Sequence, residues 1–291
     1  LGAGRRLPAG RSVVTWVHEH QAVLGAVRQL QLEGVSTRLL PVDSAGFADP
    51  ADVPEDAGLV SLGLANNEVG TLQPVAGVLG RCRALGALLH LDCCQGPRWV
   101  RPPLDLVDLA SFSGGKLGAG PGGLLVAGRE IRLQPLIYGG PQEWGRRAGR
   151  EDAAGAAAMA AAIAITGTGR EVRAGRSSRQ ARRLREALAA SGGHLTGGEP
   201  RLPNFATAAF ADRKGEDLLM ALDLAGVAAS SGSACASGSL DPSHVLLSMG
   251  LPMEAALGSL RLSVGYDTTD EQVEHAAGVL SSILAGAAKS A

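Results

Sequence analysis

Features of nucleic-acid-binding and membrane proteins are scarce in this sequence. Aromatic residues make up only 3% of its 291 residues, the formal net charge is −1, and no basic stripe is present. Binding of nucleic acid through phosphate contacts and base stacking is therefore not expected. No apolar run approaches the length of about 20 residues that crosses a bilayer, and no signal peptide is visible.

Paired cysteines and phosphate-loop motifs are also missing. Cys82, Cys93, Cys94 and Cys235 form neither a disulfide framework nor a C-x-x-C pair. Such usage is typical of a reducing compartment, so the sequence predicts a cytoplasmic protein. The G-x-x-x-x-G-K-[ST] order of a nucleotide-binding loop does not occur, because the glycines at 118–123 follow Lys116 instead of preceding it.

Apolar residues, by contrast, are abundant. They make up 45% of the chain, against 19% charged residues, so the chain can bury a sizeable core. The apolar patterns predict strands at residues 12–17, 35–42, 58–65 and 87–92, and helices at 21–33 and 74–86. This alternation predicts an α/β fold with a mostly parallel central sheet and helices on both faces.

The chain changes character after its Ala-rich segment, residues 153–165, where a helix is expected. A Gly-Thr-Gly turn and then a charged helix, expected at 177–190, follow this segment. We therefore predict a large domain over residues 1–167 and a smaller C-terminal α+β domain over residues 168–291.

Several polar side chains stand at or just after the ends of the predicted strands. The carboxyl ends of parallel strands form one edge of an open sheet, and ligands bind beyond that edge. The alternation of strands and helices therefore places these candidate site residues together: His20, Asn67, Asp92, Gln95, Ser113 and Lys116.

Lys116 lies in a glycine-rich loop, residues 111–123, between two apolar runs that we expect to be buried strands, 104–110 and 124–127. An unpaired buried ammonium is costly, and burial lowers the pKa of a lysine and makes its amine nucleophilic toward carbonyls. Schiff-base chemistry is one interpretation. The other is a side chain that extends from the loop into water.

Four further residues have both a chemical and a structural interpretation. Asp92 could pair with a protonated pyridine nitrogen, or it could cap a helix. His20 could stack on a flat ring and shuttle a proton, or it could be a capping or core histidine. Gln95 and Asn67 could bind a ring hydroxyl, or they could be ordinary turn and cap residues.

Cys235 and Arg261 are candidates in the C-terminal part of the chain. Cys235 lies among small residues at 230–235, so we expect an exposed, mobile loop that could carry a reactive thiol. The alternative is an inert surface cysteine. Arg261 follows Leu260 in a predicted strand, where its guanidinium could bind a substrate carboxylate, or could form a surface ion pair.

Taken together, these stretches resemble the NifS/IscS-like cysteine desulfurases, which belong to the pyridoxal-phosphate-dependent class V aminotransferases. The resemblance implies the type I fold of pyridoxal-phosphate-dependent transferases. It covers nearly the whole chain, and eight stretches in the same order carry it: HEHQAV at 18–23, ANNEVGTLQP at 65–74, HLDCCQ at 90–95, SFSGGK at 111–116, the loop 139–149, SSGSAC at 230–235, PSHVLL at 242–247 and LRLSVG at 260–265.

The resemblance implies roles for the residues around the pyridoxal ring. Lys116 would form the Schiff base with the cofactor, and Asp92 would pair with the pyridinium nitrogen. His20 would stack on the ring and handle protons. Gln95 and Asn67 would contact the ring hydroxyl.

The resemblance also implies the remaining roles and partners. Ser113 would bind the phosphate, and Arg261, with Asn67 nearby, would hold the carboxylate of L-cysteine. Cys235 would take the substrate sulfur as a persulfide, release L-alanine and pass the sulfur to an acceptor such as an iron-sulfur scaffold protein. The family is homodimeric, with the site near the dimer interface.

Three departures from the family's pattern stand out. Gly115 replaces the histidine that usually precedes the lysine, and Arg150 stands where the family usually has a phosphate-binding threonine. We hypothesise that Arg150 supplies the phosphate charge in place of both. The chain also begins near the family's histidine-containing strand, so we expect its sheet to lack one strand and one helix.

Other functions remain open at this point. Selenocysteine lyase and other class V aminotransferase-type enzymes share the fold and the cofactor. A metal-dependent hydrolase could use His18, His20, His90 and Asp92, since His18 and His20 share a predicted strand face. A remnant that dimerises without catalysing a reaction is the last alternative.

Overall fold

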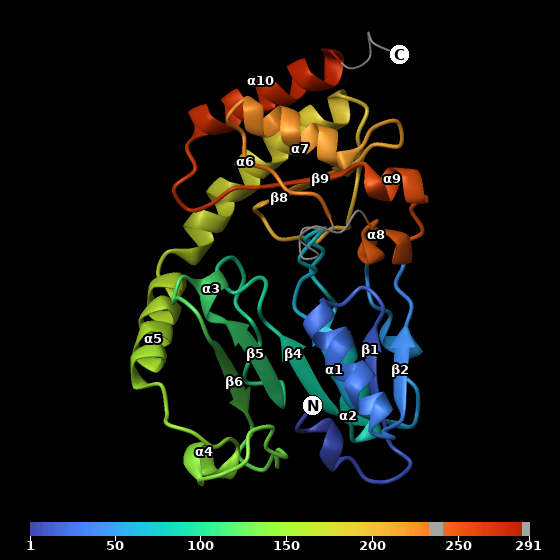
Figure 1. Cartoon of the computed structure of the whole chain (residues 1–291), viewed down its shortest axis with the longest axis vertical. Helices are drawn as coiled ribbons and strands as arrows, with labels where there is room; N and C mark the ends of the chain where they lie inside the picture. Colours follow the sequence, from blue (N-terminus) through green and yellow to red (C-terminus); the bar gives the residue numbers. More distant parts are fainter. Residues whose placement is uncertain (233–240, 287–291) are drawn as a thin grey trace. The chain divides into compact units, whose positions relative to one another are not determined.

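The computed structural model describes residues 1–232 and 241–286, and the chain forms two compact units (Figure 1). Unit 1 consists of Leu1–Pro41, Ala48–Ala65 and Gln73–Thr168, and unit 2 consists of Val42–Phe47, Asn66–Leu72 and Gly169–Ala291. Within the described residues, no helix is both long enough and apolar enough to cross a bilayer.

A six-stranded sheet forms the centre of unit 1, in the order β2-β1-β3-β4-β5-β6. All neighbouring strands are parallel except β5 and β6, which are antiparallel. This is the mostly parallel sheet that the sequence predicts. The strands are β1 (Ser12–Trp16), β2 (Thr37–Leu40), β3 (Ala57–Gly63), β4 (Leu88–Asp92), β5 (Leu109–Ser113) and β6 (Gly123–Ala127).

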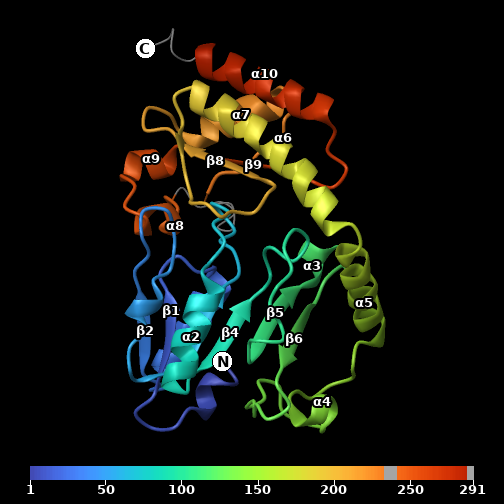
Figure 2. The ribbon, with the colours of Figure 1, turned by 180° about the vertical axis from the view of Figure 1, so that it is seen from behind.

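Helices α1 (Gln21–Leu32) and α2 (Val75–Leu85) lie on opposite faces of this sheet, as the two views of the ribbon show (Figures 1 and 2). Both have the ends that their sequences predict. The His20 side chain caps α1, and Gly86 ends α2 with a left-handed backbone, which glycine adopts without strain. The other helical segments of unit 1 are η1 (Gly4–Arg6), η2 (Pro50–Asp52), α3 (Gly114–Leu117), α4 (Gln142–Gly145) and α5 (Ala153–Gly167).

The predicted strands on either side of Lys116 need correction. Within the run 104–110, the strand begins only at Leu109. The residue before it, Asp108, uses its side chain to accept a hydrogen bond of 2.8 Å from the Leu89 amide. Residues 124–127 do form a strand, within β6, but this strand is exposed and not buried. Among the described strands it is the edge of the sheet and pairs with β5 alone, so this sheet provides its apolar side chains with a neighbouring strand on one side.

Unit 2 has a three-stranded antiparallel sheet, in the order β7-β8-β9. Its core contains Leu188, Phe210 and Leu260, all nearly fully buried. The elements are α6 (Arg170–Ala190), β7 (His194–Leu195), β8 (Phe205–Ala209), α7 (Gly215–Leu224), α8 (His244–Ser248), α9 (Met253–Leu257), β9 (Ser259–Ser263) and α10 (Asp270–Gly286).

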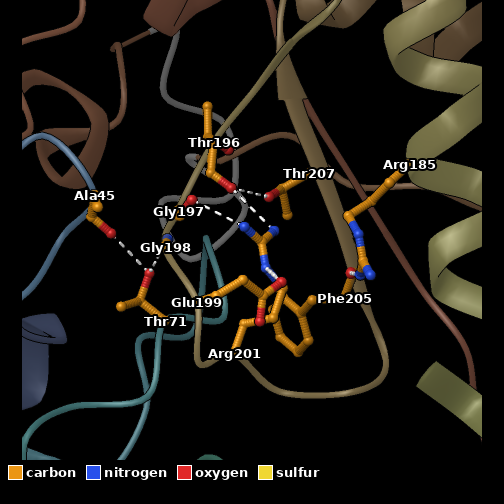
Figure 3. Close-up of polar contacts among 10 residues, drawn as sticks. All are labelled: Ala45, Thr71, Arg185, Thr196, Gly197, Gly198, Glu199, Arg201, Phe205 and Thr207. Carbon is orange, nitrogen blue, oxygen red and sulfur yellow. Dashed lines mark hydrogen bonds and ion pairs between the residues drawn. The ribbon is translucent and has the colours of Figure 1, made fainter.

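The turn 66–72 belongs to unit 2 because hydrogen bonds fasten it there (Figure 3). The Thr71 hydroxyl donates to the Ala45 carbonyl at 2.9 Å and accepts from the Gly198 amide at 3.0 Å. Arg201 supports the neighbouring loop, since its guanidinium donates to the Gly197 carbonyl at 2.9 Å and forms an ion pair with Glu199. The sequence predicts a single domain boundary at residue 167, and it does not predict that residues 66–72 belong to unit 2.

Candidate active site

The carboxyl ends of β3, β4 and β5 lie side by side in unit 1. The strand register pairs Gly63 with Asp92 and Asp92 with Ser111. Ser113 lies two residues farther along the same face of β5 and is half-buried, and Lys116 follows it in α3. The structure therefore brings Asp92, Ser113 and Lys116 to one edge of the sheet, as strand alternation predicts.

A chain of polar contacts across three strands holds the Asp92 carboxylate. Asp92 Oδ1 accepts hydrogen bonds from the Cys94 amide at 2.9 Å and from the Ser111 hydroxyl at 3.2 Å. Ser111 Oγ lies 3.1 Å from His90 Nε2, and His90 Nδ1 lies 2.8 Å from Ser61 Oγ. We call these residues, together with Ser113, the polar edge. Burial lowers the pKa of His90, which favours a neutral imidazole that links the two serines.

The structure decides between the alternatives for two residues of this edge. Asp92 does not cap a helix; its carboxylate stabilises the turn at Cys94. The side chain of Lys116 is exposed, which agrees with the interpretation that it extends into water, but Lys116 lies in the single helical turn α3 and not in a loop. Burial and the Asp92 carboxylate raise the pKa of Cys94 to about 12, and the Lys116 ammonium opposes this shift.

His20 lies at the carboxyl end of β1, where its Nδ1 accepts a hydrogen bond of 3.1 Å from the Ala22 amide. His20 is therefore the N-cap of α1, which agrees with the capping role that the sequence left open for it. Residues 17–20 form a turn, so His18 and His20 share no strand face. In the described parts of the chain, no three His, Cys, Asp or Glu side chains are grouped so that they could hold a metal ion, and the four residues of the hydrolase alternative form no such group.

Glu19 is a buried carboxyl that the sequence analysis missed. Its Oε1 accepts a hydrogen bond of 2.8 Å from the amide of Gly63, at the end of β3. Burial, with a smaller contribution from Asp92, raises its pKa to about 8. A glutamate three residues after the end of a fully buried strand was the available signal, because such a position allows a charged group only with compensation.

The remaining candidates of unit 1 are less constrained. Gln95 is half-buried in the turn after β4, and Arg150 is exposed in the segment before α5. No hydrogen bond links either of them to Asp92. A Cβ atom at Gly114 would lie 2.7 Å from the Gly120 carbonyl oxygen, so this position requires glycine, whereas a Cβ at Gly115 would meet no atom within 4 Å.

Asn67 and Arg261 come together in unit 2. The Arg261 guanidinium donates to the backbone carbonyl of Asn67 at 2.7 Å and to the Ser230 hydroxyl at 3.1 Å. Asn66, for which the sequence predicted no role, shapes this turn, because its side-chain oxygen accepts hydrogen bonds from the backbone amides of Glu68 and Val69. Cys235 lies outside the described residues.

The donor set of the polar edge fits a pyridoxal group chemically. A half-buried carboxylate held by two donors can accept a pyridinium proton, a nearby exposed primary amine can react with an aldehyde, and serine hydroxyls can bind phosphate oxygens. These are chemical capacities of Asp92, Lys116 and Ser113.

Comparisons with known proteins give consistent results. The aminotransferase class-V family matches residues 1–275. "Cysteine desulfurase IscS" from Clostridium botulinum (strain Kyoto / Type A2) is 37% identical over 289 residues, which cover 94% of this chain and 72% of the relative. "Cysteine desulfurase NifS" from Azotobacter vinelandii is 39% identical over 94% of this chain and 71% of the relative. A solved structure described as a NifS-like protein superposes with a TM-score of 0.88 at 31% identity, covering 98% of this chain and 78% of that chain.

Proposed function

Since this chain belongs to the class V aminotransferase family and, within it, to the NifS/IscS-like cysteine desulfurases, we propose that its polar edge holds the pyridoxal phosphate on which these enzymes depend. The resemblance and the fold class predicted from the sequence are confirmed. The protein is a pyridoxal-phosphate-dependent cysteine desulfurase, a sulfur-transferring enzyme.

The observation that supports the cofactor site most strongly is the way Asp92 is held. The bound cofactor supplies an electron sink for bond cleavage at the substrate amino acid. Asp92 would accept the proton of the ring nitrogen, and its contacts to Cys94 and Ser111 orient the carboxylate for this. Lys116, exposed on α3, would bind the cofactor aldehyde, and Ser113 would bind the phosphate.

Further residues would complete the proposed cofactor site. The His20 imidazole would stack on the ring and hold the proton that moves during the reaction. Gln95 would contact the ring hydroxyl, together with Asn67. Arg150 would supply phosphate charge where relatives usually have a threonine, and a guanidinium suits a phosphate because it can donate two hydrogen bonds in one plane.

The substrate-handling residues are proposed in the C-terminal part of the chain. Arg261 would bind the carboxylate of L-cysteine, with Asn67 beside it. The Cys235 thiol would attack the substrate sulfur. The carbon–sulfur bond of L-cysteine would break and a sulfur–sulfur bond would form on Cys235. The carbon skeleton would keep the electron pair of the broken bond, take up the proton that the Cys235 thiol gives up, and leave as L-alanine. This exchange balances without an external oxidant or reductant.

The wider setting is proposed from the relatives. Two of them carry the names IscS and NifS, and we propose that this protein likewise passes its persulfide sulfur to an acceptor protein, such as an iron-sulfur scaffold. We also propose a homodimer in the cytoplasm. Size-exclusion chromatography with light scattering would contradict the homodimer if it gave the mass of one chain.

The proposed function is tested by titrating the purified protein with pyridoxal phosphate and then adding L-cysteine. We expect a visible absorbance band, lost in Lys116→Ala and retained in Lys214→Ala, which removes an exposed lysine of unit 2. L-Alanine should form in the wild type, and Cys235→Ser should abolish it while keeping the band. Arg150→Ala should bind the cofactor about tenfold more weakly, as expected for loss of one charge-assisted contact.

Two results would contradict the proposal. A band of unchanged intensity in Lys116→Ala would show that another group binds the cofactor. Alanine formation at the wild-type rate in Cys235→Ser would show that Cys235 does not take the sulfur. Cofactor affinity unchanged in Arg150→Ala would remove the role assigned to Arg150 alone.

A further inference from the structure

Glu68 is a buried carboxyl in the turn that presents Asn67. Only 6% of Glu68 is exposed. Its backbone is fixed, because the Asn66 side chain accepts a hydrogen bond of 2.8 Å from the Glu68 amide. The far end of the turn is fastened through Thr71 (Figure 3). The carboxyl is therefore held on a rigid support within unit 2.

The first contact of the Glu68 carboxylate is with Ser243, whose hydroxyl donates a short hydrogen bond to Oε2. Ser243 is itself nearly fully buried. It is the N-cap of α8, and its hydroxyl oxygen accepts a hydrogen bond of 3.2 Å from the Leu246 amide. Glu68 thus orients the hydroxyl that starts α8.

The second contact is with Gly232, which approaches the same carboxylate closely. A Cβ atom at Gly232 would lie 2.9 Å from Glu68 Oε2, 3.1 Å from the Ser243 Cβ and 3.0 Å from the Ser259 hydroxyl. The Gly232 amide donates to that hydroxyl at 3.0 Å. No other residue type fits here without displacing one of these partners.

Gly232 and Ser243 are separated in the sequence by the stretch that contains Cys235. Glu68 therefore touches a residue on each side of that stretch, and its backbone adjoins Asn67, which accepts a hydrogen bond from Arg261. Arg261 also makes two backbone hydrogen bonds with Ser230, just before Gly232. The proposed carboxylate-binding arginine and both flanks of Cys235 thus meet at one turn.

We propose that Glu68 is a positioning residue for sulfur transfer, which fixes Gly232 and Ser243, and with them the two flanks of Cys235, to the turn that presents Asn67. The inference rests on the proposed role of Cys235. Fixing both ends of a chain segment restricts where its members can reach, so a thiol tethered in this way attacks a bound substrate at a higher effective concentration. Burial raises the pKa of the Glu68 carboxyl to about 7, although the hydrogen bond from Ser243 and, to a smaller extent, the charge of Arg261 oppose this shift.

The experiment compares Glu68→Ala, Glu68→Gln and the control Gln180→Ala in the full chain loaded with pyridoxal phosphate. Gln180 is an equally buried polar residue of unit 2 that bonds to Thr268 and Asp270, away from Glu68. Three quantities are measured: the dissociation constant for pyridoxal phosphate, kcat and KM for alanine formation, and the rate of persulfide formation on the Cys235 peptide. Hydrogen exchange of the Leu246 amide, measured without cofactor, reports the flank directly.

We expect Glu68→Ala to lower kcat and persulfide formation about 10- to 100-fold, the loss that misplacement of a reacting group produces. KM and cofactor affinity should stay within about twofold, as expected when only the transfer step is affected. The Leu246 amide should exchange faster in this variant. Glu68→Gln keeps a side-chain oxygen that can accept from Ser243, so it should restore most of the rate.

The outcomes separate this inference from the function on which it rests. Absence of a Cys235 persulfide in the wild type would contradict the proposed function. A wild type that forms persulfide, with Glu68→Ala equally fast, would overturn the positioning role alone. An equal loss of rate in Gln180→Ala, or a Leu246 amide unchanged in Glu68→Ala, would also overturn it, because the effect would not come from the flanks of Cys235.

Discussion

His90 determines how the Asp92 carboxylate is held in unit 1. The imidazole lies between Ser61 of β3 and Ser111 of β5, and Ser111 donates in turn to Asp92. Without His90, the buried Ser61 hydroxyl and the half-buried Ser111 hydroxyl would each lose a partner, and an unsatisfied buried polar group costs about 1–3 kcal/mol. Part of this cost should appear as looser orientation of the carboxylate.

We therefore predict that His90→Ala weakens pyridoxal phosphate binding about tenfold, which corresponds to about 1.4 kcal/mol. An absorbance or fluorescence titration with the cofactor measures the change. The control is His194→Ala, which removes an exposed histidine from β7 in unit 2. Equal affinities of His90→Ala and His194→Ala would contradict a role for His90 in holding Asp92.

At the scale of residues, the sequence predicted positions better than environments. The order of strands and helices is enough to place Asp92, Ser113 and Lys116 at one edge. It does not predict that Lys116 is exposed, because exposure depends on what surrounds α3 in space. Glu19 and Glu68 were missed for a related reason, since a carboxyl after an apolar strand or in a turn reveals its burial only when its neighbours are known.

At the scale of elements, β4 and β6 show how position in the sheet decides what an apolar residue contributes. β4 is an inner strand, and its Leu91 is fully buried. β6 is the edge strand, and its Leu125 is 49% exposed. Burial of apolar surface is the main source of stability, so the same side chain contributes more in β4 than in β6.

This difference predicts the result of two identical truncations. Leu91→Ala should destabilise the protein by about 2–5 kcal/mol, the usual cost of a cavity in a core. Leu125→Ala should cost less than about 1 kcal/mol, because little of its surface leaves water on folding. Urea denaturation of the two variants and the wild type measures both values. Similar losses in the two variants would show that β6 is covered in solution.

The success of element prediction followed the strength of local signals. Pro74 and Gly86 bracket α2 because proline suits the start of a helix and glycine its end, and the predicted helix agrees with the structure. The single turn α3 has no such signal in its glycine-rich sequence. The exposure of β6 was not predictable either, because an apolar run reads the same at the edge of a sheet as in its centre.

At the scale of the whole molecule, the family could be identified from the sequence because eight motifs occur in one order. The assignment of residues 66–72 to unit 2 could not, since it depends on hydrogen bonds such as that from Gly198 to Thr71. The division into domains at residues 167 and 168 stays a prediction, because compactness in space does not establish which segments fold independently. Limited proteolysis with mass spectrometry would contradict it if no cleavage occurred near that boundary.

The pH dependence of global stability follows from the two buried glutamates. Burial raises the pKa of Glu19 to about 8 and that of Glu68 to about 7, against 4.5 for an ordinary glutamate. Below pH 4.5 both groups carry protons in the folded and the unfolded chain. Above that pH the two glutamates lose their protons in the unfolded chain before they do so in the folded protein. The contribution of each glutamate to the stability of the fold therefore falls as pH rises, until pH passes the pKa of that glutamate in the folded protein.

We therefore predict that the double variant Glu19→Gln, Glu68→Gln loses less stability than the wild type between pH 5 and pH 8.5. Glutamine has nearly the same shape, can accept the bonds from Gly63 and Ser243, and never ionises. Since each unit of pKa shift corresponds to about 1.4 kcal/mol, the difference between the two proteins should reach several kcal/mol. Urea denaturation at a series of pH values measures it, and comparison with the wild type cancels the titration of all other groups. Parallel curves for the two proteins would show that neither carboxyl is held protonated by burial.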